Sequence, residues 1–453
     1  MKNLQYDYTN ILETTIGSQG LNLEKIKELE SKLVAANKKF TTTPDASEFA
    51  FHRLLEASKE LLAIKYTANF LSKSFENLIV IGVGGSDLGA RAVIGALKSY
   101  YHNELPEKKR GGMRVYFCGD TTDPKPLEEL LENIDLQKTA INVISKSGNT
   151  LETMSVFFAI RQKLIKKVGV NQHKNHIIVT TDPSSGYLQK IAQKEGYRVL
   201  AHDTVGGRFS VLSTTGLLAC ACAGIDIDNL IAGAQEMRVL TKKNAVEKNS
   251  SFLFAAINYL GYKNGKNISV LMPYDYKLKE FGGWFKQLWG ESLGKNNLGQ
   301  TPVNSLGPTD QHSQLQLYQQ GPFDKIITFI KSEAENELKT PEVKTDGIEY
   351  FGENKFKDLL DAELEATATA LAQEGKMNGT IIVPEVNEFY IGQLIYFFEL
   401  ATYYSGELYE INAFDQPGVE LGKNYIHTLI GKPNSKELLD KLKEKSKIKK
   451  SLV

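Results

Sequence analysis

The sequence predicts an α/β protein with parallel-sheet cores. Short runs rich in Val, Ile and Phe alternate along the chain with stretches of helix length. Near-continuous apolar strands of this kind occur in parallel sheets that helices cover on both faces. The 453 residues exceed one ordinary core, and the strand-like runs form two successive series. We therefore expect two α-β-α sandwich domains of similar size, or one large two-lobed unit.

The first series of strands lies in residues 61–235, with the runs NLIVIGVGG, MRVYFCGD, AINVISKSG, HIIVTTD and YRVLAHD. A helical connection is expected over 236–265. The second series lies in 266–432, with the runs NISVLMPYD, DKIITFIKS, GTIIVPEVN and ELYEINAFDQPG. Residues 1–60 have the apolar spacing of a helical segment, and 433–453 predict a helical tail with a basic end.

The composition excludes several classes of function. Lys plus Arg number 54 and Asp plus Glu number 54, so no net charge recruits nucleic acid or an anionic membrane. The first residues lack the features of a signal peptide, and no apolar run approaches the ~20 residues of a membrane span. We expect a cytoplasmic protein. Cys118, Cys220 and Cys222 lie in strand-like or small-residue runs and are expected to be buried apolar residues rather than disulfide or zinc ligands.

A glycine-rich turn, GVGGSDLG at residues 82–89, follows the first strand and precedes a helix that begins near Ala90. Such a turn brings backbone N–H groups and a helix N-terminus to an oxyanion. It is not a nucleotide signature, because Asp87 stands where the dinucleotide pattern needs glycine and the Gly-Lys-Ser/Thr ending of a P-loop is absent. A tight turn without a ligand is the alternative.

A second turn, SKSGNT at residues 145–150, lies between the strand AINVI and the helix LETMSVFFAIRQKLI. The hydroxyls of Ser145, Ser147 and Thr150, the ammonium of Lys146 and a helix N-terminus can together surround a phosphate monoester. Serine and threonine are also ordinary helix N-caps, so capping is the alternative. Since no nucleotide signature accompanies the turn, a small sugar phosphate fits better than a nucleotide.

Four further residues are candidates for proton transfer or charge stabilisation. Arg208 follows two glycines in GGRFS and can stabilise developing negative charge. Glu291 lies beside both tryptophans in WFKQLWGESLGK, and we expect desolvation by this apolar surface to suit it to a proton shuttle. His312, in an amide-rich stretch, can relay a proton, and Lys423 follows a turn in FDQPGVELGK. For each of them a surface or structural role is the alternative. No paired histidines or cysteines have the spacing of a metal site, so no metal is expected.

Six ordered segments resemble those of the glucose-6-phosphate isomerase family: VIGVGGSDLGARAV, VISKSGNTLET, VGGRFSVLS, KQLWGESLGK, TDQHSQ and FDQPGVELGK. The resemblance implies two sugar-isomerase-type (SIS) domains and a place in glycolysis and gluconeogenesis. It implies ring opening and the reversible aldose–ketose isomerisation of glucose 6-phosphate and fructose 6-phosphate through a cis-enediolate, with no cofactor. One departure is Asn149, where related sequences often have threonine, although its amide can still donate to a phosphate.

The resemblance also implies a role for each matched residue. Glu291 would move the proton between C2 and C1, and Arg208 would stabilise the enediolate. His312 and Lys423 would assist ring opening. In the family the histidine enters from the neighbouring subunit, so a homodimer or higher homo-oligomer is implied, and Glu152 resembles the residue that orients it. The phosphate and sugar would be held by Gly85, Ser86, Ser145, Lys146, Ser147, Thr150, Gln287 and Gln416.

Three alternative functions fit the sequence less well. A dual phosphoglucose/phosphomannose isomerase usually has a shorter chain, and the GESLGK and FDQPGVELGK segments count against it. A regulatory protein that senses sugar phosphates would keep the phosphate turns and needs no base, so the presence of Glu291, His312 and Lys423 favours catalysis. A dehydrogenase is disfavoured by Asp87.

Overall fold

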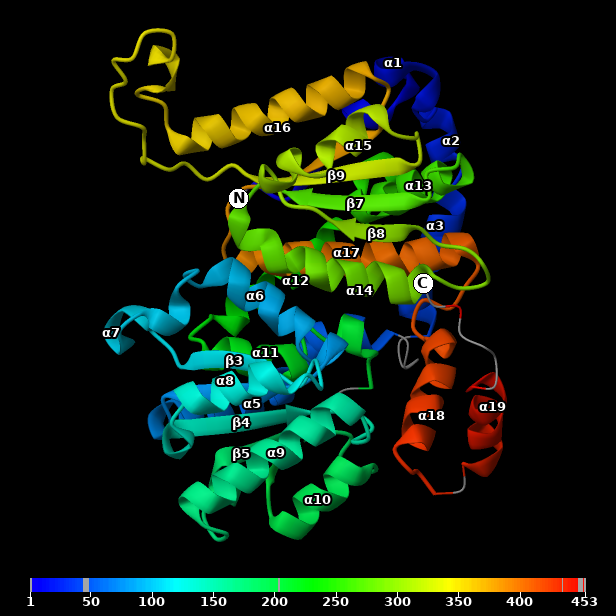
Figure 1. Ribbon diagram of the computed structural model, residues 1–453. Helices are drawn as coiled ribbons and strands as arrows, with labels where there is room; N and C mark the ends of the chain where they lie inside the picture. The colour runs from blue at the N-terminus through cyan, green and yellow to red at the C-terminus, as the bar shows by residue number, and fades with distance from the viewer. Residues whose placement is uncertain (1, 44–48, 203, 434, 447–450, 452–453) are drawn as a thin grey trace. The chain divides into compact units, whose positions relative to one another are not determined.

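The structure is a computed structural model, and it describes residues 2–43, 49–202, 204–433, 435–446 and 451 (Figure 1). The chain forms two compact units, Met1–Ala413 and Phe414–Val453. The larger unit contains two five-stranded sheets, each covered by helices. This arrangement confirms the expected α/β fold with parallel-sheet cores. The domain boundaries drawn from the sequence stay a prediction.

The first sheet is entirely parallel and has the strand order β3-β2-β4-β5-β6. Its strands are β2 (Asn77–Ile81), β3 (Arg114–Cys118), β4 (Thr139–Ile144), β5 (Ile177–Thr181) and β6 (Arg198–Ala201). All five lie within runs that the sequence marks as strands. Every residue of β2, β4 and β5 is buried, which explains why these runs carry no polar alternation.

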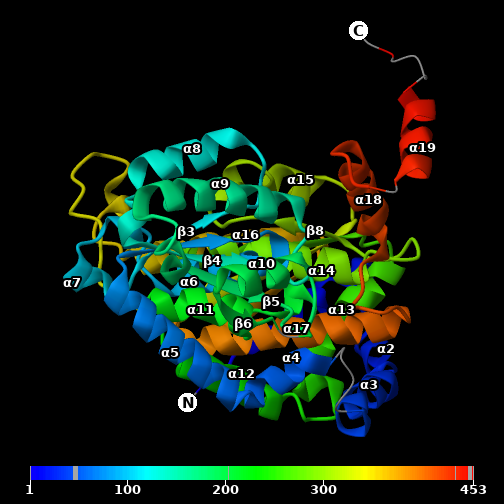
Figure 2. The same ribbon diagram turned by 90° about the horizontal axis from the view of Figure 1, so that it is seen from below.

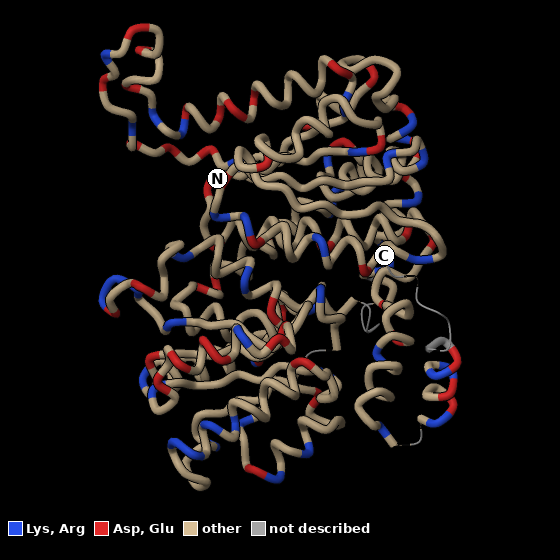
Figure 3. The backbone as a smooth tube through the Cα atoms, viewed as in Figure 1, with Lys and Arg blue, Asp and Glu red and all other residues tan. Residues whose placement is uncertain are grey.

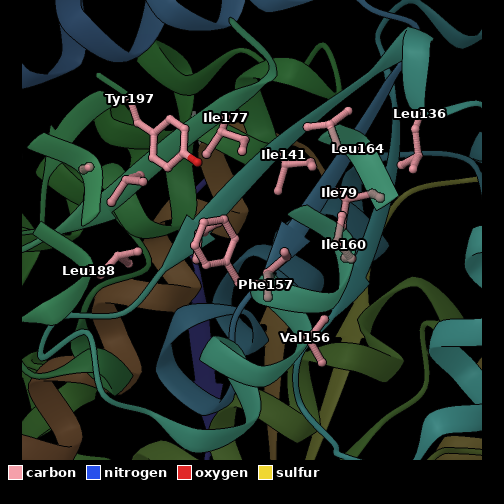
Figure 4. Packing of buried hydrophobic residues seen from close by; sticks show 14 residues of the cluster. Ile79, Leu136, Ile141, Val156, Phe157, Ile160, Leu164, Ile177, Leu188 and Tyr197 are labelled. Carbon is pink, nitrogen blue, oxygen red and sulfur yellow. The ribbon is translucent and has the colours of Figure 1, made fainter. Parts of the chain in front are cut away.

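Helices cover both faces of this sheet. The helices are α5 (Ser58–Ser74), α6 (Leu88–Leu97), α7 (Glu107–Arg110), α8 (Pro124–Asn133), α9 (Leu151–Val168), α10 (Tyr187–Glu195) and α11 (Thr214–Cys222). On one face, side chains of α8, α9 and α10 pack on the strands, with Phe157 of α9 against Ile141 and Ile177 in the same cluster (Figure 4). On the other face, α11 contacts β2 and α6.

The second sheet has the order β1-β10-β9-β7-β8, and only β1 runs antiparallel to its neighbour. Its strands are β1 (Gln5–Asp7), β7 (Ile268–Pro273), β8 (Thr301–Asn304), β9 (Lys325–Ser332) and β10 (Asn378–Val383). The sequence did not predict the two edge strands. β1 lies in the segment expected to be helical, and β8 contains Pro302, which an edge strand tolerates because one side of its backbone needs no partner.

The helices around the second sheet begin in the N-terminal segment, where α1 (Glu13–Ile16), α2 (Leu23–Lys27), α3 (Glu30–Thr42) and α4 (Ala50–Arg53) confirm its mainly helical character. The remaining helices of the larger unit are α12 (Ile227–Leu240), α13 (Ser250–Lys263), α14 (Lys279–Leu293), α15 (Leu315–Gln320), α16 (Phe356–Gln373) and α17 (Glu388–Tyr409). Helix α14 packs against α6 and so connects the layers of the two sheets.

The expected strand in ELYEINAFDQPG is wrong. Its first three residues form the end of α17, a 22-residue helix that ends where Glu410 adopts the left-handed conformation, with φ 59°. Helix α17 is buried on nearly all sides and lies alongside α12, α13 and α14 (Figure 2). A helix that is apolar all round has no amphipathic periodicity, so its pattern cannot be distinguished from that of a buried strand.

The smaller unit contains α18 (Glu420–Leu429) and α19 (Lys436–Ser446), and α19 confirms the helical tail. The expected basic end at 447–450 lies outside the described residues. Lysines and acidic residues are mixed along α19, and elsewhere the two signs are interspersed along the backbone (Figure 3). Within the described ranges, no helix is both long and apolar enough to cross a membrane.

Candidate active site

The two glycine-rich turns leave adjacent strands of the first sheet. The first follows β2 and contains the 3₁₀ turn η5 (Gly84–Ser86), and the second, at residues 145–150, follows β4. Strands β2 and β4 pair directly in the sheet. In the sequence β3 comes between them, and it lies on the other side of β2. This is the point at which the strand order reverses, and in open parallel sheets ligands bind outside the carboxyl ends of the strands at such a point.

The turn at residues 145–150 is held by its own hydroxyl groups. The buried Ser145 Oγ accepts a hydrogen bond from the Gly148 N–H at 3.1 Å and lies 3.1 Å from Thr150 Oγ1. Gly148 has φ 65°, and a Cβ there would lie 2.4 Å from the backbone nitrogen of Leu188. Thr150 precedes α9, but its side chain makes no capping hydrogen bond to the helix. The capping alternative therefore does not describe this threonine.

Two more side chains of the turn have defined partners. Lys146 Nζ donates to the carbonyl of Thr204 at 2.8 Å. This contact ties the turn to the segment that leads to Gly206 and Arg208. Ser147 Oγ donates to Asn149 Oδ1, which leaves the Nδ2 group of that amide as its donor side.

The turn after β2 packs against the turn that carries Arg208, η9 (Gly207–Phe209), backbone against backbone. A Cβ on Gly85 would lie 2.1 Å from the carbonyl carbon of Gly207, so no side chain fits between them. Ser210 Oγ also donates to the Gly85 carbonyl at 3.3 Å. Gly85 and Gly207 therefore let the two turns approach closely, and this contact fixes the position of the Arg208 backbone.

Arg208 is 2% exposed, and its guanidinium reaches Glu291, Ser292 and Ala413. Nη1 lies 3.3 Å from Oε2 of Glu291, Nε donates to Ser292 Oγ at 2.7 Å, and Nη2 donates to the Ala413 carbonyl at 2.6 Å. The Trp284 indole Nε1 donates to the Arg208 carbonyl at 3.1 Å. Because the guanidinium is planar and rigid, its contacts with Glu291, Ser292 and Ala413 depend on one another, and together they fix its position.

Gln287 links Glu291 to the turn after β2. It lies one helical turn before Glu291 on α14, and its Nε2 is 3.4 Å from Glu291 Oε2. A Cβ on Gly84 would come within 2.9 Å of the same Nε2 atom, so the amide lies directly over the turn. Gly84, Gln287, Glu291 and Arg208 thus form one continuous cluster, which we call the Glu291 cluster.

The expected apolar surroundings of Glu291 are not observed. Trp289 is fully buried and stacks on Phe285, in the core beneath α14. Two residues correspond to about 200° around a helix, so Trp289 and Glu291 point to nearly opposite sides. The Glu291 side chain is 34% exposed and faces the guanidinium of Arg208. Charged and amide donors orient this carboxylate, and the Trp289 ring points away from it.

Among the described residues of the larger unit, the side chains of Ser86, Glu152 and His312 make no hydrogen bond to the Glu291 cluster. Ser86 is half-buried in η5, and Glu152 is half-buried in the first turn of α9. His312 ends the 3₁₀ turn η12 (Thr309–His312) after β8 and is exposed, and its side chain bonds to no other described residue. The smaller unit carries Gln416 and Lys423, and Lys423 Nζ lies 3.0 Å from Glu420 Oε1.

Ser292 was missed as a site residue. It is fully buried and accepts from Arg208 Nε, and its position directly after Glu291 in the GESLGK segment is the signal that could have found it. As predicted, Cys220 and Cys222 are buried, and Cys118 is half-buried with a pKa raised to about 12 by desolvation. In the described part of the chain, no three His, Cys, Asp or Glu side chains gather in a way that could hold a metal.

The hydroxyl-rich turn lies at the reversal point of a parallel sheet, and the turn after the adjacent strand packs on the turn that carries the buried Arg208. The class is an α/β protein whose turns carry groups of the kind that bind a phosphate and move a proton. The chain belongs to the phosphoglucose isomerase family, whose model matches residues 52–447.

Curated relatives match nearly the whole chain. A probable glucose-6-phosphate isomerase of Methanococcus maripaludis is 40% identical over 433 residues, which cover 94% of each chain. A glucose-6-phosphate isomerase of Carboxydothermus hydrogenoformans is 39% identical and covers 99% of this chain and 98% of its own.

Two solved structures are similar to the model. A hypothetical protein of Thermus thermophilus is 34% identical with a TM-score of 0.83, covering 94% of this chain and 100% of its own. A glucose-6-phosphate isomerase of Chlamydia trachomatis is 25% identical with a TM-score of 0.70, covering 85% of this chain and 76% of its own.

Proposed function

We propose that the chain catalyses the reversible isomerisation of glucose 6-phosphate and fructose 6-phosphate, with Glu291 as the base. Family membership and the activity in the names of its relatives support the reaction. The observation that carries the assignment of the base is the ion pair between Glu291 and the buried Arg208, beside the glycine turn after β2.

The turn at residues 145–150 would bind the phosphate. Its hydroxyls, the Lys146 ammonium and the uncapped N-terminus of α9 supply donors and positive charge to one anion. The bond from Lys146 to Thr204 supports a fixed spacing between the phosphate end of the site and Arg208. Gly85, Ser86 and Gln287 would contact the sugar between these two ends.

Glu291 would take the proton from C2 of the open-chain aldose and return it to C1. The electron pair left by the C–H bond passes to the carbonyl oxygen, which gives the enediolate, and Arg208 would stabilise that oxyanion with a charge it cannot lose. The proton of the C2 hydroxyl passes to the oxygen on C1 as C2 becomes the carbonyl, so no group leaves and no electrons are transferred to another molecule.

His312, Lys423 and Gln416 would act on the sugar ring. His312 and Lys423 would transfer protons at the ring oxygen and the C1 hydroxyl during ring opening, while Gln416 would contact substrate. The exposed position of His312, without a partner among the described residues, supports its donation to the site of a second subunit, oriented there by Glu152. The proposal therefore includes a homodimer, and the composition supports a cytoplasmic location.

A coupled assay tests this function. Purified protein is expected to form glucose 6-phosphate from fructose 6-phosphate without added nucleotide or metal. Glu291→Gln should bind substrate and lose turnover, whereas Glu280→Gln, at an exposed position on the same helix, should keep it. Absence of product from the wild-type protein would refute the reaction, and an active Glu291→Gln variant would refute the base.

A further inference from the structure

The last residues of the larger unit are held tightly against the end of α17. The Ile411 N–H donates to the Gly406 carbonyl at 3.0 Å, and Ala413 is 3% exposed. A Cβ on Gly406 would lie 2.9 Å from Cβ of Ala413, so the glycine makes room for the chain to fold back. We call residues 411–413 the exit segment, because the next residue, Phe414, begins the smaller unit.

Two cationic side chains from the Glu291 cluster and its flank bind successive carbonyls of the exit segment. Arg208 Nη2 donates to the Ala413 carbonyl at 2.6 Å. Lys295 Nζ donates to the Asn412 carbonyl, and also to the Ser292 carbonyl at 3.0 Å. Since Ser292 follows Glu291 directly and Arg208 pairs with Glu291, both cations connect the exit segment to the base.

We propose that Lys295 is a positioning residue for the isomerase reaction. It fixes the exit segment to the helix that carries Glu291, and so holds in place the Ala413 carbonyl to which the guanidinium of Arg208 donates. This inference rests on the proposed function. Lysine suits the task because one ammonium has three donors on a flexible stem and can bind carbonyls from two different elements.

A purely structural role is the competing explanation. Lys295 lies just past the end of α14 and binds one of the last carbonyls of that helix, which stabilises a helix C-terminus by itself. A cap of this kind affects unfolding and has no reason to act through Arg208. The second bond, to Asn412, is the one that a cap does not need.

The test is a double-mutant cycle between Lys295 and Arg208. Lys295→Met should lower kcat by about 10-fold or more with little change in KM, because a misplaced catalytic group costs rate rather than affinity. In an Arg208→Lys background the same substitution should cost less than about 3-fold, because the guanidinium it positions is already absent. Lys295→Arg should restore part of the rate.

Lys286→Met is the matched control, since Lys286 is an exposed lysine of the same helix and should leave both constants unchanged. If Lys295→Met does not fold, Lys295→Gln, which keeps an amide donor, is measured instead. Equal losses in the two backgrounds, or a loss that only follows the folded fraction in thermal unfolding, would overturn the inference. Either result would leave the isomerase assignment intact, because the wild-type assay tests that separately.

Discussion

Arg208 and Glu291, from a turn of the first sheet and a helix of the second, meet at 3.3 Å with the arginine buried. They are far apart in sequence, and the close approach of Gly85 to Gly207 is what brings the guanidinium to this position. Arg208 also binds Ser292 and Ala413, so the same side chain orients the proposed base and holds the exit segment.

Replacing Arg208 by lysine should separate charge from geometry. Lysine keeps the positive charge but cannot bind Glu291, Ser292 and Ala413 with one planar fork, so kcat should fall by about 10²-fold while KM changes little. Steady-state kinetics measure both constants. Arg238→Lys, at a half-buried arginine paired with Glu56 away from the Glu291 cluster, is the control and should be neutral. A change confined to KM would contradict the enediolate role.

Gly85→Ala should damage stability and rate together. The added Cβ has no space against Gly207, so the two turns must separate, at a cost of about 1–3 kcal/mol of folding free energy. Gly283→Ala is the comparison, because a Cβ there meets nothing and alanine favours a helix. Denaturant unfolding and the assay report both effects. A Gly85→Ala protein as active and stable as Gly283→Ala would show that the close approach is unimportant.

Lys146→Met should weaken binding of the phosphate more than it slows the reaction. Loss of the ammonium removes a charge-assisted hydrogen bond to the anion, so KM for fructose 6-phosphate should rise about 10-fold. Inhibition by inorganic phosphate should weaken in parallel. Lys138→Met, at an exposed lysine paired with Glu76 before β4, should leave both unchanged. An unaltered phosphate inhibition constant in Lys146→Met would remove this turn from the binding site.

Asp87 should make the stability of the protein depend on pH. Burial raises the pKa of its carboxyl from 3.8 to about 6, although Arg91, with Nε 2.6 Å away, opposes the shift. Between these pH values the folded state holds the proton more tightly than the unfolded chain. The contribution is therefore fully present below about pH 4 and is lost as the pH rises through 6.

The substitution Asp87→Asn removes this titration. The difference in unfolding free energy between wild type and variant should change by about 3 kcal/mol from pH 4 to pH 7, to the disadvantage of the wild type at high pH. Taking this difference cancels groups with the opposite trend, such as His52, whose pKa is lowered to about 4 by desolvation. Asp120→Asn, at an exposed carboxylate that also pairs with Arg91, is the control. Parallel curves for wild type and Asp87→Asn would refute the shift.

The sequence predicted the strands whose burial leaves a clear apolar run, such as β2 and β4, and both turns that follow them. It did not predict β1 or β8, because an edge strand of three or four residues has too few positions to show a pattern. The motifs predicted Glu291 and Arg208 as site residues, but they did not predict the contact between the two side chains. The bond of Ser292 to Arg208 and that of Lys295 to Asn412 could not be predicted either, since only the fold places α14 beside η9 and the exit segment.

The central claim is that Glu291 transfers a proton between C2 and C1, whereas the alternative is direct transfer of a hydride between these carbons. Isomerisation in D₂O tests this claim most directly. A carboxylic acid exchanges its proton with solvent, so product and recovered substrate should contain deuterium at C1 of fructose 6-phosphate and C2 of glucose 6-phosphate. The Glu291→Gln variant should bind fructose 6-phosphate and incorporate none, while Glu280→Gln should match the wild type. Wild-type turnover without any deuterium in either sugar, or incorporation by Glu291→Gln at the wild-type rate, would contradict the account.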